Sequence, residues 1–173
     1  LYFMWKSSPI EALNFSPDEM RTRTYQVLST LHNLHVYFRQ NSEFDKFDAD
    51  KHTLQWVLEN NLQSPTEVWL NLVTEVTGAF ERCRYHEGAK AIDSFIINHL
   101  SQTYVPLTRN VIWDDSAENL DRRLAVYAVL GHALEKIDII LHPLSPFITE
   151  YLYSTCFSRS GRKKSVLLET WPE

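Results

Sequence analysis

The sequence predicts an all-α fold, an antiparallel bundle of four long helices with a short fifth helix and an extended C-terminal tail. Apolar residues recur at spacings of three and four along most of the chain, and strand-like alternation is scarce. Serine followed by proline and an acidic residue marks helix starts. With 173 residues, 44% of them hydrophobic, the chain can bury one core, so we expect a single helical domain over residues 1–173.

The first helix is expected to begin in the string FSPDEM. Ser16 can cap it, Pro17 suits the first helical position, and Glu19 stands where a capping box needs it. The helix should fade between residues 41 and 45. Its apolar face consists of Thr24, Val27, Leu31, Leu34 and Phe38.

The second long helix is expected to begin at Ser64, where Pro65 follows and Glu67 closes another capping box. Its apolar stripe consists of Trp69, Leu72, Val73, Val76, Phe80 and Cys83. The string HTLQWVLEN before it predicts a short helix that packs Trp56 against the bundle.

The third helix is expected to run from about Glu87 to Val111. Pro106 should kink it or end it, because proline lacks a donor and clashes one turn back. In the break that follows, Asp115 is a candidate cap, with Glu118 three residues further on. The stripe of this helix consists of Ala89, Ile92, Phe95, Ile96, Leu100 and Leu107.

The fourth helix has the strongest pattern, from Leu120 to Leu141. It should stop at His142, because a proline follows. A Ser-Pro pair then restarts the chain as a short fifth helix, Phe147 to Phe157. The closing string SVLLETWPE is expected to be extended, with Trp171 packed back on the bundle.

The net charge of −5 argues against a protein that binds nucleic acid by bulk attraction, so any RNA contact must use local basic clusters. Cys83 and Cys156 lie far apart in no paired motif, which favours neither a disulfide framework nor a zinc site and makes the cytosol the default compartment. No apolar run approaches the length of a membrane span. The opening string LYFMWKSSP suggests a fragment of a longer protein or a tag remnant.

Catalytic motifs are scarce. The chain contains no glycine-rich nucleotide loop, GxSxG, CxxC or HExxH, so we expect no catalytic residues and no metal site. His32 and His35 lie on adjacent helical positions and could share a metal, but a partly buried pair explains them as well. Asp93 and Asp138 lie near apolar stripes, which leaves an acid–base pair open.

Basic residues gather near several helix ends. Arginine forks match phosphate, and exposed aromatic rings can stack on unpaired bases. Ordinary solvated helix ends would account for the same pattern. The candidate RNA contacts are Arg82, Arg84, Lys90, Arg109, Trp113, Arg122, Arg123, Lys163 and Lys164.

Several strings together resemble the anticodon-binding bundle of class I isoleucyl-tRNA synthetases. In chain order they are SSPIEALNFSPDEM, LSTLHNLHVYF, VTEVTGAFERCRYHEGAKAIDSFIINHLSQTYV, LHPLSPFITEYLY and SVLLETWPE. The resemblance runs from about Trp5 to Glu173. Valyl-tRNA synthetases share the turn around HPLSPFITE, whereas LNFS and ETWPE favour the isoleucine enzymes.

This resemblance implies a module that binds the anticodon arm of isoleucine tRNA and positions it for a catalytic domain of the same parent chain. The fragment itself would hold no cofactor and be inactive, while the parent would use ATP and Mg²⁺. A cytoplasmic monomer is expected. Where the family often has several arginines after LSxxY, this chain keeps only Arg109. The alternatives are a valyl-tRNA synthetase domain, a stand-alone helical protein-interaction module, and a helical enzyme or metal protein.

Overall fold

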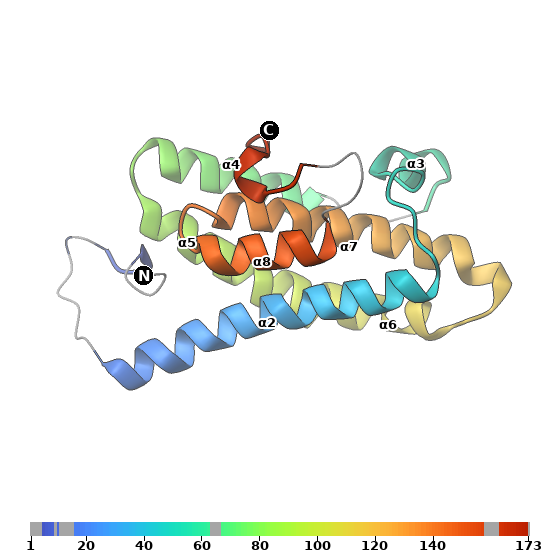
Figure 1. The fold of residues 1–173 in the computed structure, drawn as a ribbon, viewed down its shortest axis with the longest axis horizontal. Coiled ribbons are helices and arrows are strands. Elements are labelled where there is room, and N and C mark those ends of the chain that lie inside the picture. The colour runs from blue at the N-terminus through green and yellow to red at the C-terminus, as the bar shows by residue number, and fades with distance from the viewer. Residues whose placement is uncertain (1–4, 9, 11–15, 63–66, 158–162, 173) are drawn as a thin grey trace.

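The computed structural model describes residues 5–8, 10, 16–62, 67–157 and 163–172, with the side chains of residues 67–70 left aside (Figure 1). Within these ranges the chain is helical and contains no strand, which confirms the all-α class. The helices are α2 (Pro17–Phe44), α3 (Leu54–Glu59), α4 (Glu67–Glu81), α5 (Tyr85–Ser94), η1 (Phe95–Tyr104), α6 (Val105–Trp113), η2 (Ala117–Asn119), α7 (Leu120–Leu141), α8 (Pro146–Cys156) and η3 (Val166–Leu168).

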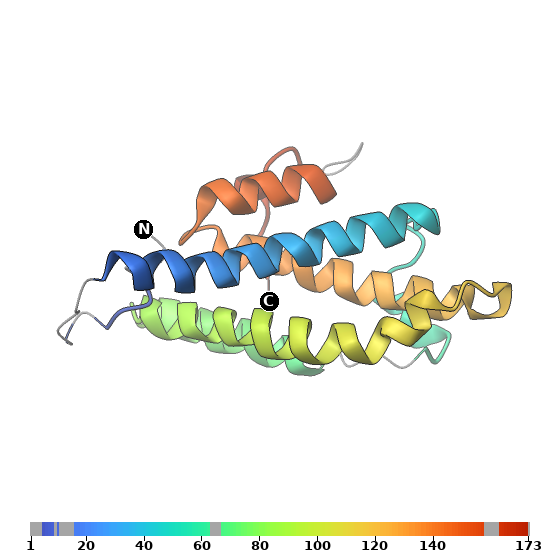
Figure 2. The same ribbon diagram turned by 90° about the horizontal axis from the view of Figure 1, so that it is seen from below.

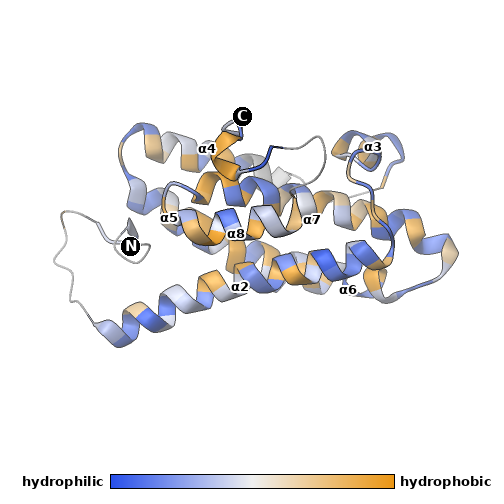
Figure 3. Cartoon of the chain, viewed as in Figure 1, coloured by the Kyte–Doolittle hydropathy of each residue, from blue (hydrophilic) through white to orange (hydrophobic). Residues whose placement is uncertain are grey.

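The long helices alternate in direction along the bundle. The chain runs one way in α2, back in α4, forward again through α5, η1 and α6, back in α7, and forward in α8 (Figures 1 and 2). Figure 3 shows apolar residues along the faces where helices meet and polar residues on the outer faces. The predicted antiparallel bundle is therefore confirmed.

Helix α7 is the centre of the bundle. It contacts α2, α3, α4, α5, α6 and α8, and it is buried almost continuously from Arg123 to Leu141. A helix covered on all sides is apolar around its whole circumference rather than along one stripe. Leu134, Ile137 and Ile140 are completely buried, and each such side chain contributes about 1.5–3 kcal/mol.

Most predicted helix boundaries are correct. The hydroxyl of Ser16 accepts a hydrogen bond from the Glu19 amide at 3.4 Å, and α2 ends at Phe44 with Asp45 as its cap. The short helix before α4 is present, and Trp56 packs against the core. Helix α7 ends at Leu141, as the following proline requires. The predicted Ser64 cap lies outside the described residues.

Pro106 does not end its helix. The helical path continues from Tyr85 to Trp113, and the stretch before the proline, η1, adopts π-helical hydrogen bonding. The amide of Val105 donates to the carbonyl of Leu100, five residues back. Pro106 then occupies the first turn of α6, directly after the π-helical segment.

The π segment also overturns one predicted core residue. Leu107 was placed on the buried stripe, yet it is 71% exposed. A π turn holds more residues than an α turn, so positions after it rotate away from a stripe extrapolated at α-helical spacing. Cys83 is likewise exposed rather than on the stripe of α4, because the helix ends at Glu81 and Cys83 adopts a left-handed conformation, φ 56°, in the turn that follows.

The prediction that Asp115 caps the helix after the α6–α7 corner is wrong. Asn119 holds this corner instead, because its side-chain amide donates to the carbonyls of Val111 at 2.8 Å and Asp114 at 3.3 Å. Arg123 adds a hydrogen bond to the carbonyl of Ser116 at 3.1 Å. The two side chains thus donate to carbonyls on both sides of the corner.

The C-terminal tail is partly helical rather than wholly extended. Residues Val166–Leu168 form a 3₁₀ turn, and the hydroxyl of Ser165 accepts from the Leu167 amide at 3.2 Å. Trp171 packs back on the bundle as predicted. Its indole nitrogen donates to the Thr77 hydroxyl at 2.8 Å, and its ring lies 5.7 Å from that of Phe80.

Candidate nucleic-acid interface

The structure divides the candidate RNA contacts between the two ends of the bundle. Arg82 and Arg84 lie at the α4–α5 turn, at the end of the bundle that holds the start of α2, and Lys90 lies on α5 (Figure 1). Arg109 and Trp113 lie on α6 at the opposite end. At about 1.5 Å per residue, roughly 35 Å separates Lys90 from Trp113 along the helix. One small ligand cannot contact both groups.

Arg109 and Trp113 form a pair on the surface of α6. They stand four residues apart and therefore share a face of the helix. The guanidinium of Arg109 lies 5.4 Å from the centroid of the Trp113 ring, and Trp113 is 69% exposed. The charge of Arg109 also acts on Tyr37 of α2, whose pKa is raised by burial and partly lowered again by this arginine. The pair thus presents a cation and a flat ring to solvent.

Arg122 lines a groove beside α6 to which neither Arg109 nor Trp113 contributes. The groove has a volume of about 620 Å³ and is bounded by α6, α7 and the turn that follows α3. Arg122 is exposed at the first turn of α7. The residues that line the groove are Asn60, Asn61, Leu62, Tyr104, Leu107, Thr108, Val111, Arg122, Ala125 and Val126.

Arg123, unlike the other candidates, is buried and forms an ion pair within the protein. Its side chain is 6% exposed, and its guanidinium donates to both carboxylate oxygens of Asp45, at 2.8 and 2.9 Å. The hydroxyl of Tyr127 donates to the same carboxylate at 2.8 Å. The hydrogen bond from Arg123 lowers the pKa of Asp45, and burial raises the pKa of Tyr127. Arg123 therefore fastens the end of α2 to α7.

The basic residues elsewhere are partly paired with acids. Arg84 lies 3.3 Å from the carboxylate of Glu87, and Lys163 lies 3.4 Å from Glu169. Arg82, Lys90 and Lys164 are exposed. Among the described residues, these charges are divided between the α4–α5 turn, α5 and the segment before η3.

Acidic side chains limit where an anion can approach the α6–α7 corner. Asp114, Asp115, Glu118 and Asp121 are all exposed there. Hydrogen bonding from Ser116 lowers the pKa of Asp114, which keeps that carboxylate charged. These carboxylates repel a phosphate from the corner.

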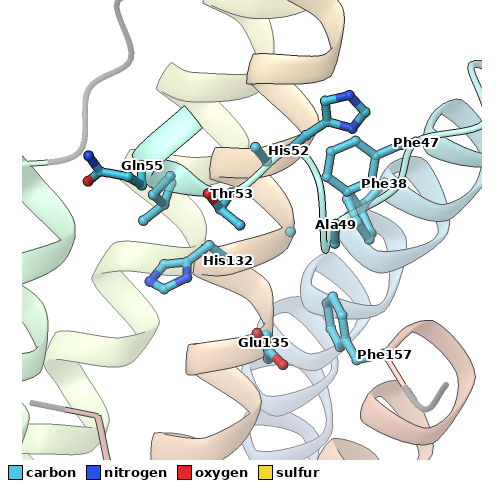
Figure 4. A pocket seen from close by; sticks show the side chains of 12 residues that line it. Phe38, Phe47, Ala49, His52, Thr53, Gln55, His132, Glu135 and Phe157 are labelled. Atoms are coloured by element: carbon cyan, nitrogen blue, oxygen red, sulfur yellow. The ribbon is translucent and has the colours of Figure 1, made fainter. Parts of the chain in front are cut away.

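A second hollow lies beside α7, at the segment between α2 and α3 (Figure 4). It has a volume of about 290 Å³. Rings of Phe38, Phe47 and Phe157 form much of its wall, and His132 and Glu135 enter it from α7. Helical periodicity did not indicate this hollow, because it depends on how the irregular segment after α2 folds back.

The two histidines singled out in the sequence have separate partners. The ring of His32 stacks on that of Tyr151 at 6.4 Å, whereas His35 hydrogen-bonds to Asp138 in the core. Asp93 forms an ion pair with Lys6, whereas Asp138 pairs with His35. Across the part of the chain that the structure describes, no three His, Cys, Asp or Glu side chains gather closely enough to hold a metal ion. Among the same residues, no helix combines the length and apolarity needed to cross a bilayer.

The architecture defines a class, the all-α bundles built around a buried central helix. A family model described as the anticodon-binding domain of tRNA ligase matches residues 68–173. The chain belongs to this family, which confirms the resemblance noted in the sequence.

Relatives of this chain include isoleucine–tRNA ligases and valine–tRNA ligases. The chain is 34% identical over 177 residues to the isoleucine–tRNA ligase of Methanopyrus kandleri, with 99% of this chain and 16% of the relative covered. It is 34% identical over 179 residues to that of Pyrobaculum aerophilum, covering 99% of this chain and 18% of the relative. The valine–tRNA ligase of Streptococcus agalactiae is 25% identical over 172 residues, covering 96% and 18%. The chain thus spans less than a fifth of the length of these relatives.

Proposed function

We propose that residues 1–173 are the module of an isoleucine–tRNA ligase that recognises the anticodon arm of its tRNA. The observation that carries this proposal is the exposed Arg109–Trp113 pair at one end of the bundle, with Arg122 exposed on the first turn of α7 at the same end. A guanidinium fork suits a phosphate, and an exposed indole suits an unstacked base. Single-stranded loops offer both groups together.

The negative net charge shapes how such a module works. With a net charge of −5, the protein gains little from long-range attraction, so its contacts must be local. Phosphate contacts set position and base contacts set specificity. Binding energy at this remote site would hold the acceptor end of the tRNA at a catalytic domain elsewhere in the parent.

The remaining exposed basic residues are secondary contacts in this proposal. Arg82, Arg84 and Lys90 would meet the RNA backbone at the other end of the bundle, and Lys163 and Lys164 would meet it beside the C-terminal turn. Arg123 is left out, because its guanidinium is already bound to Asp45 and to backbone carbonyls.

The parent protein would supply the chemistry. ATP and Mg²⁺ would bind its catalytic domain, and the module would act as a cytoplasmic monomer that binds isoleucine tRNA. The support for the isoleucine enzymes over the valine enzymes is the higher identity, 34% against 25%.

Titration of the chain with isoleucine tRNA, and with the same tRNA carrying a swapped anticodon, tests this proposal. We expect tighter binding to the isoleucine tRNA and a steep loss of affinity as salt is raised, because each phosphate contact releases counterions. Calorimetry or filter binding would measure both. Equal affinity for the two tRNAs would overturn anticodon recognition, and no binding at low salt would overturn the function altogether.

A further inference from the structure

The last turn of α6, which carries Trp113, is held by a side chain from outside the helix. An α-helix leaves its final carbonyls without partners from its own backbone, and α6 ends at Trp113. The side-chain amide of Asn119 donates to the carbonyl of Val111 at 2.8 Å and to that of Asp114 at 3.3 Å. These carbonyls lie two residues before Trp113 and directly after it. One side chain therefore bridges the backbone on both sides of Trp113.

Asn119 is placed to support this turn and not to touch a ligand. It is the last residue of η2, directly before α7 begins, and it is 8% exposed. A side-chain amide has two N–H hydrogens, and the two hydrogen bonds of Asn119 use both of them. An RNA bound at the surface would therefore find no donor there.

Arg123 holds the same backbone from a second direction. Its guanidinium donates to the carbonyl of Asp114 and is also bound to Asp45 at the end of α2, at 2.8 and 2.9 Å. The chain after Trp113 is thus tied to α7 and to α2. Ile112, which is 7% exposed, packs into the core directly before Trp113.

The turn that is held in this way carries the Arg109–Trp113 pair. The ring of Trp113 is 69% exposed, with the guanidinium of Arg109 at 5.4 Å from its centroid. Helix ends fray, and a backbone that must be ordered on binding costs affinity. Fixing the backbone on both sides of Trp113 removes this part of the cost before the RNA arrives.

We propose that Asn119 is a positioning residue for RNA binding, which holds the last turn of α6 so that Arg109 and Trp113 meet the RNA from a fixed backbone. The inference rests on the proposed function and adds a residue that the RNA does not touch. It differs from a purely structural role because affinity is lost in protein that is still folded.

The first test is the affinity of Asn119→Ala for isoleucine tRNA. Alanine removes both donors and adds no charge near the RNA. We expect binding to weaken about three- to tenfold, measured well below the melting temperature of the variant so that unfolded protein is negligible. Asn98→Ala is the matched control, since it removes an exposed asparagine amide that donates to the Ser94 hydroxyl at 3.0 Å on η1. It should change the affinity less than about twofold.

A double-mutant cycle shows whether Asn119 acts through the exposed pair. In protein that already carries Arg109→Gln and Trp113→Ala, adding Asn119→Ala should change the affinity less than about twofold. Low salt keeps binding of the weakened variants measurable. A general loss of stability would not depend on the background in this way.

Trp113 gives a second readout that needs no RNA. The chain contains five tryptophans, so protein labelled with 5-fluorotryptophan has five fluorine resonances, and Trp113→Phe identifies the one from Trp113. We expect Asn119→Ala to shift or broaden the Trp113 resonance and to leave the other resonances in place. A global change in the fold would move them together.

The outcomes separate this inference from the proposed function. If wild-type protein binds tRNA and Asn119→Ala binds equally well, the positioning role is wrong and tRNA recognition stands. The same holds if the affinity falls equally in both backgrounds, if Asn98→Ala weakens binding as much, or if the Trp113 resonance does not change. If wild-type protein does not bind tRNA, the proposed function fails and this inference fails with it.

Discussion

His35 of α2 and Asp138 of α7 share one proton in the core of the bundle. Their side chains are 1% and 0% exposed, and Nε2 of His35 lies 3.0 Å from Oδ2 of Asp138. Nδ1 of His35 lies 2.9 Å from the carbonyl of Leu31, which can only accept, so Nδ1 carries a hydrogen. The contact between the two side chains then needs one further proton, on either the imidazole or the carboxyl group.

This pair predicts a pH dependence of stability. Burial raises the pKa of Asp138 to about 6, a shift that His35 opposes and Glu135 reinforces. Because the folded pKa lies above the ordinary value, the stability linked to this proton is complete below about pH 4 and is lost as the pH rises through about 6. We expect the loss to be on the order of 1–3 kcal/mol.

Urea unfolding of wild-type and Asp138→Asn protein between pH 4 and pH 7 measures this pH-dependent loss of stability. Asp45, with its lowered pKa, titrates in the opposite sense in both proteins, so the difference between them isolates the His35–Asp138 pair. Asparagine keeps the shape and cannot ionise, and the variant should therefore gain relative stability toward pH 7. A constant difference across this range would contradict the shared-proton account.

Two adjacent arginines should respond differently to the same substitution. Arg123→Gln breaks the buried pair with Asp45 and leaves an uncompensated carboxylate, which should lower the free energy of unfolding by about 3–5 kcal/mol. Arg122→Gln changes an exposed side chain and should alter it by less than about 0.5 kcal/mol. Denaturant titrations compare the two variants, and similar losses would show that Arg123 is not the fastening residue.

Gly131 on α7 should not tolerate alanine, although alanine favours helices. A Cβ atom there would lie 2.7 Å from Cζ of Phe38, closer than a real contact allows, so the buried ring would have to shift from its present packing. We expect Gly131→Ala to destabilise the fold by about 1–3 kcal/mol through overpacking. Gly78→Ala is the control, since its new atom meets only the end of the Arg82 side chain at 3.2 Å, and it should be neutral or stabilising. Thermal unfolding of both variants measures the contrast.

Trp113 should matter for RNA binding and not for folding. Because its ring is 69% exposed, Trp113→Ala should leave the melting temperature within a degree or two of wild type. If the ring stacks on a base, the substitution should cost about 1–3 kcal/mol of affinity for isoleucine tRNA. Trp113→Phe should recover part of the loss in the same titration, and full affinity of Trp113→Ala would remove Trp113 from the proposed site.

The sequence predicted those elements that local physics controls. Ser16 caps α2, and the proline after His142 ends α7, because capping and proline geometry act within a few residues. Leu107 was misplaced because a change from α to π hydrogen bonding leaves no mark in apolar spacing. The candidate contact Arg123 is buried because its partner, Asp45, lies at the end of another helix. Pairing across helices has no sequence period.

Because the helical path from Tyr85 to Trp113 is unbroken, the number of residues in this segment fixes which way the side chains of α6 point. Adding one residue before Pro106 would advance α6 by about 1.5 Å and rotate it by about 100°. Arg109 and Trp113 would then point away from their present surface, and Ile112, which is 7% exposed, would leave the core. Insertions tolerated between the two ends should therefore come in three or four residues at a time, close to a whole helical turn.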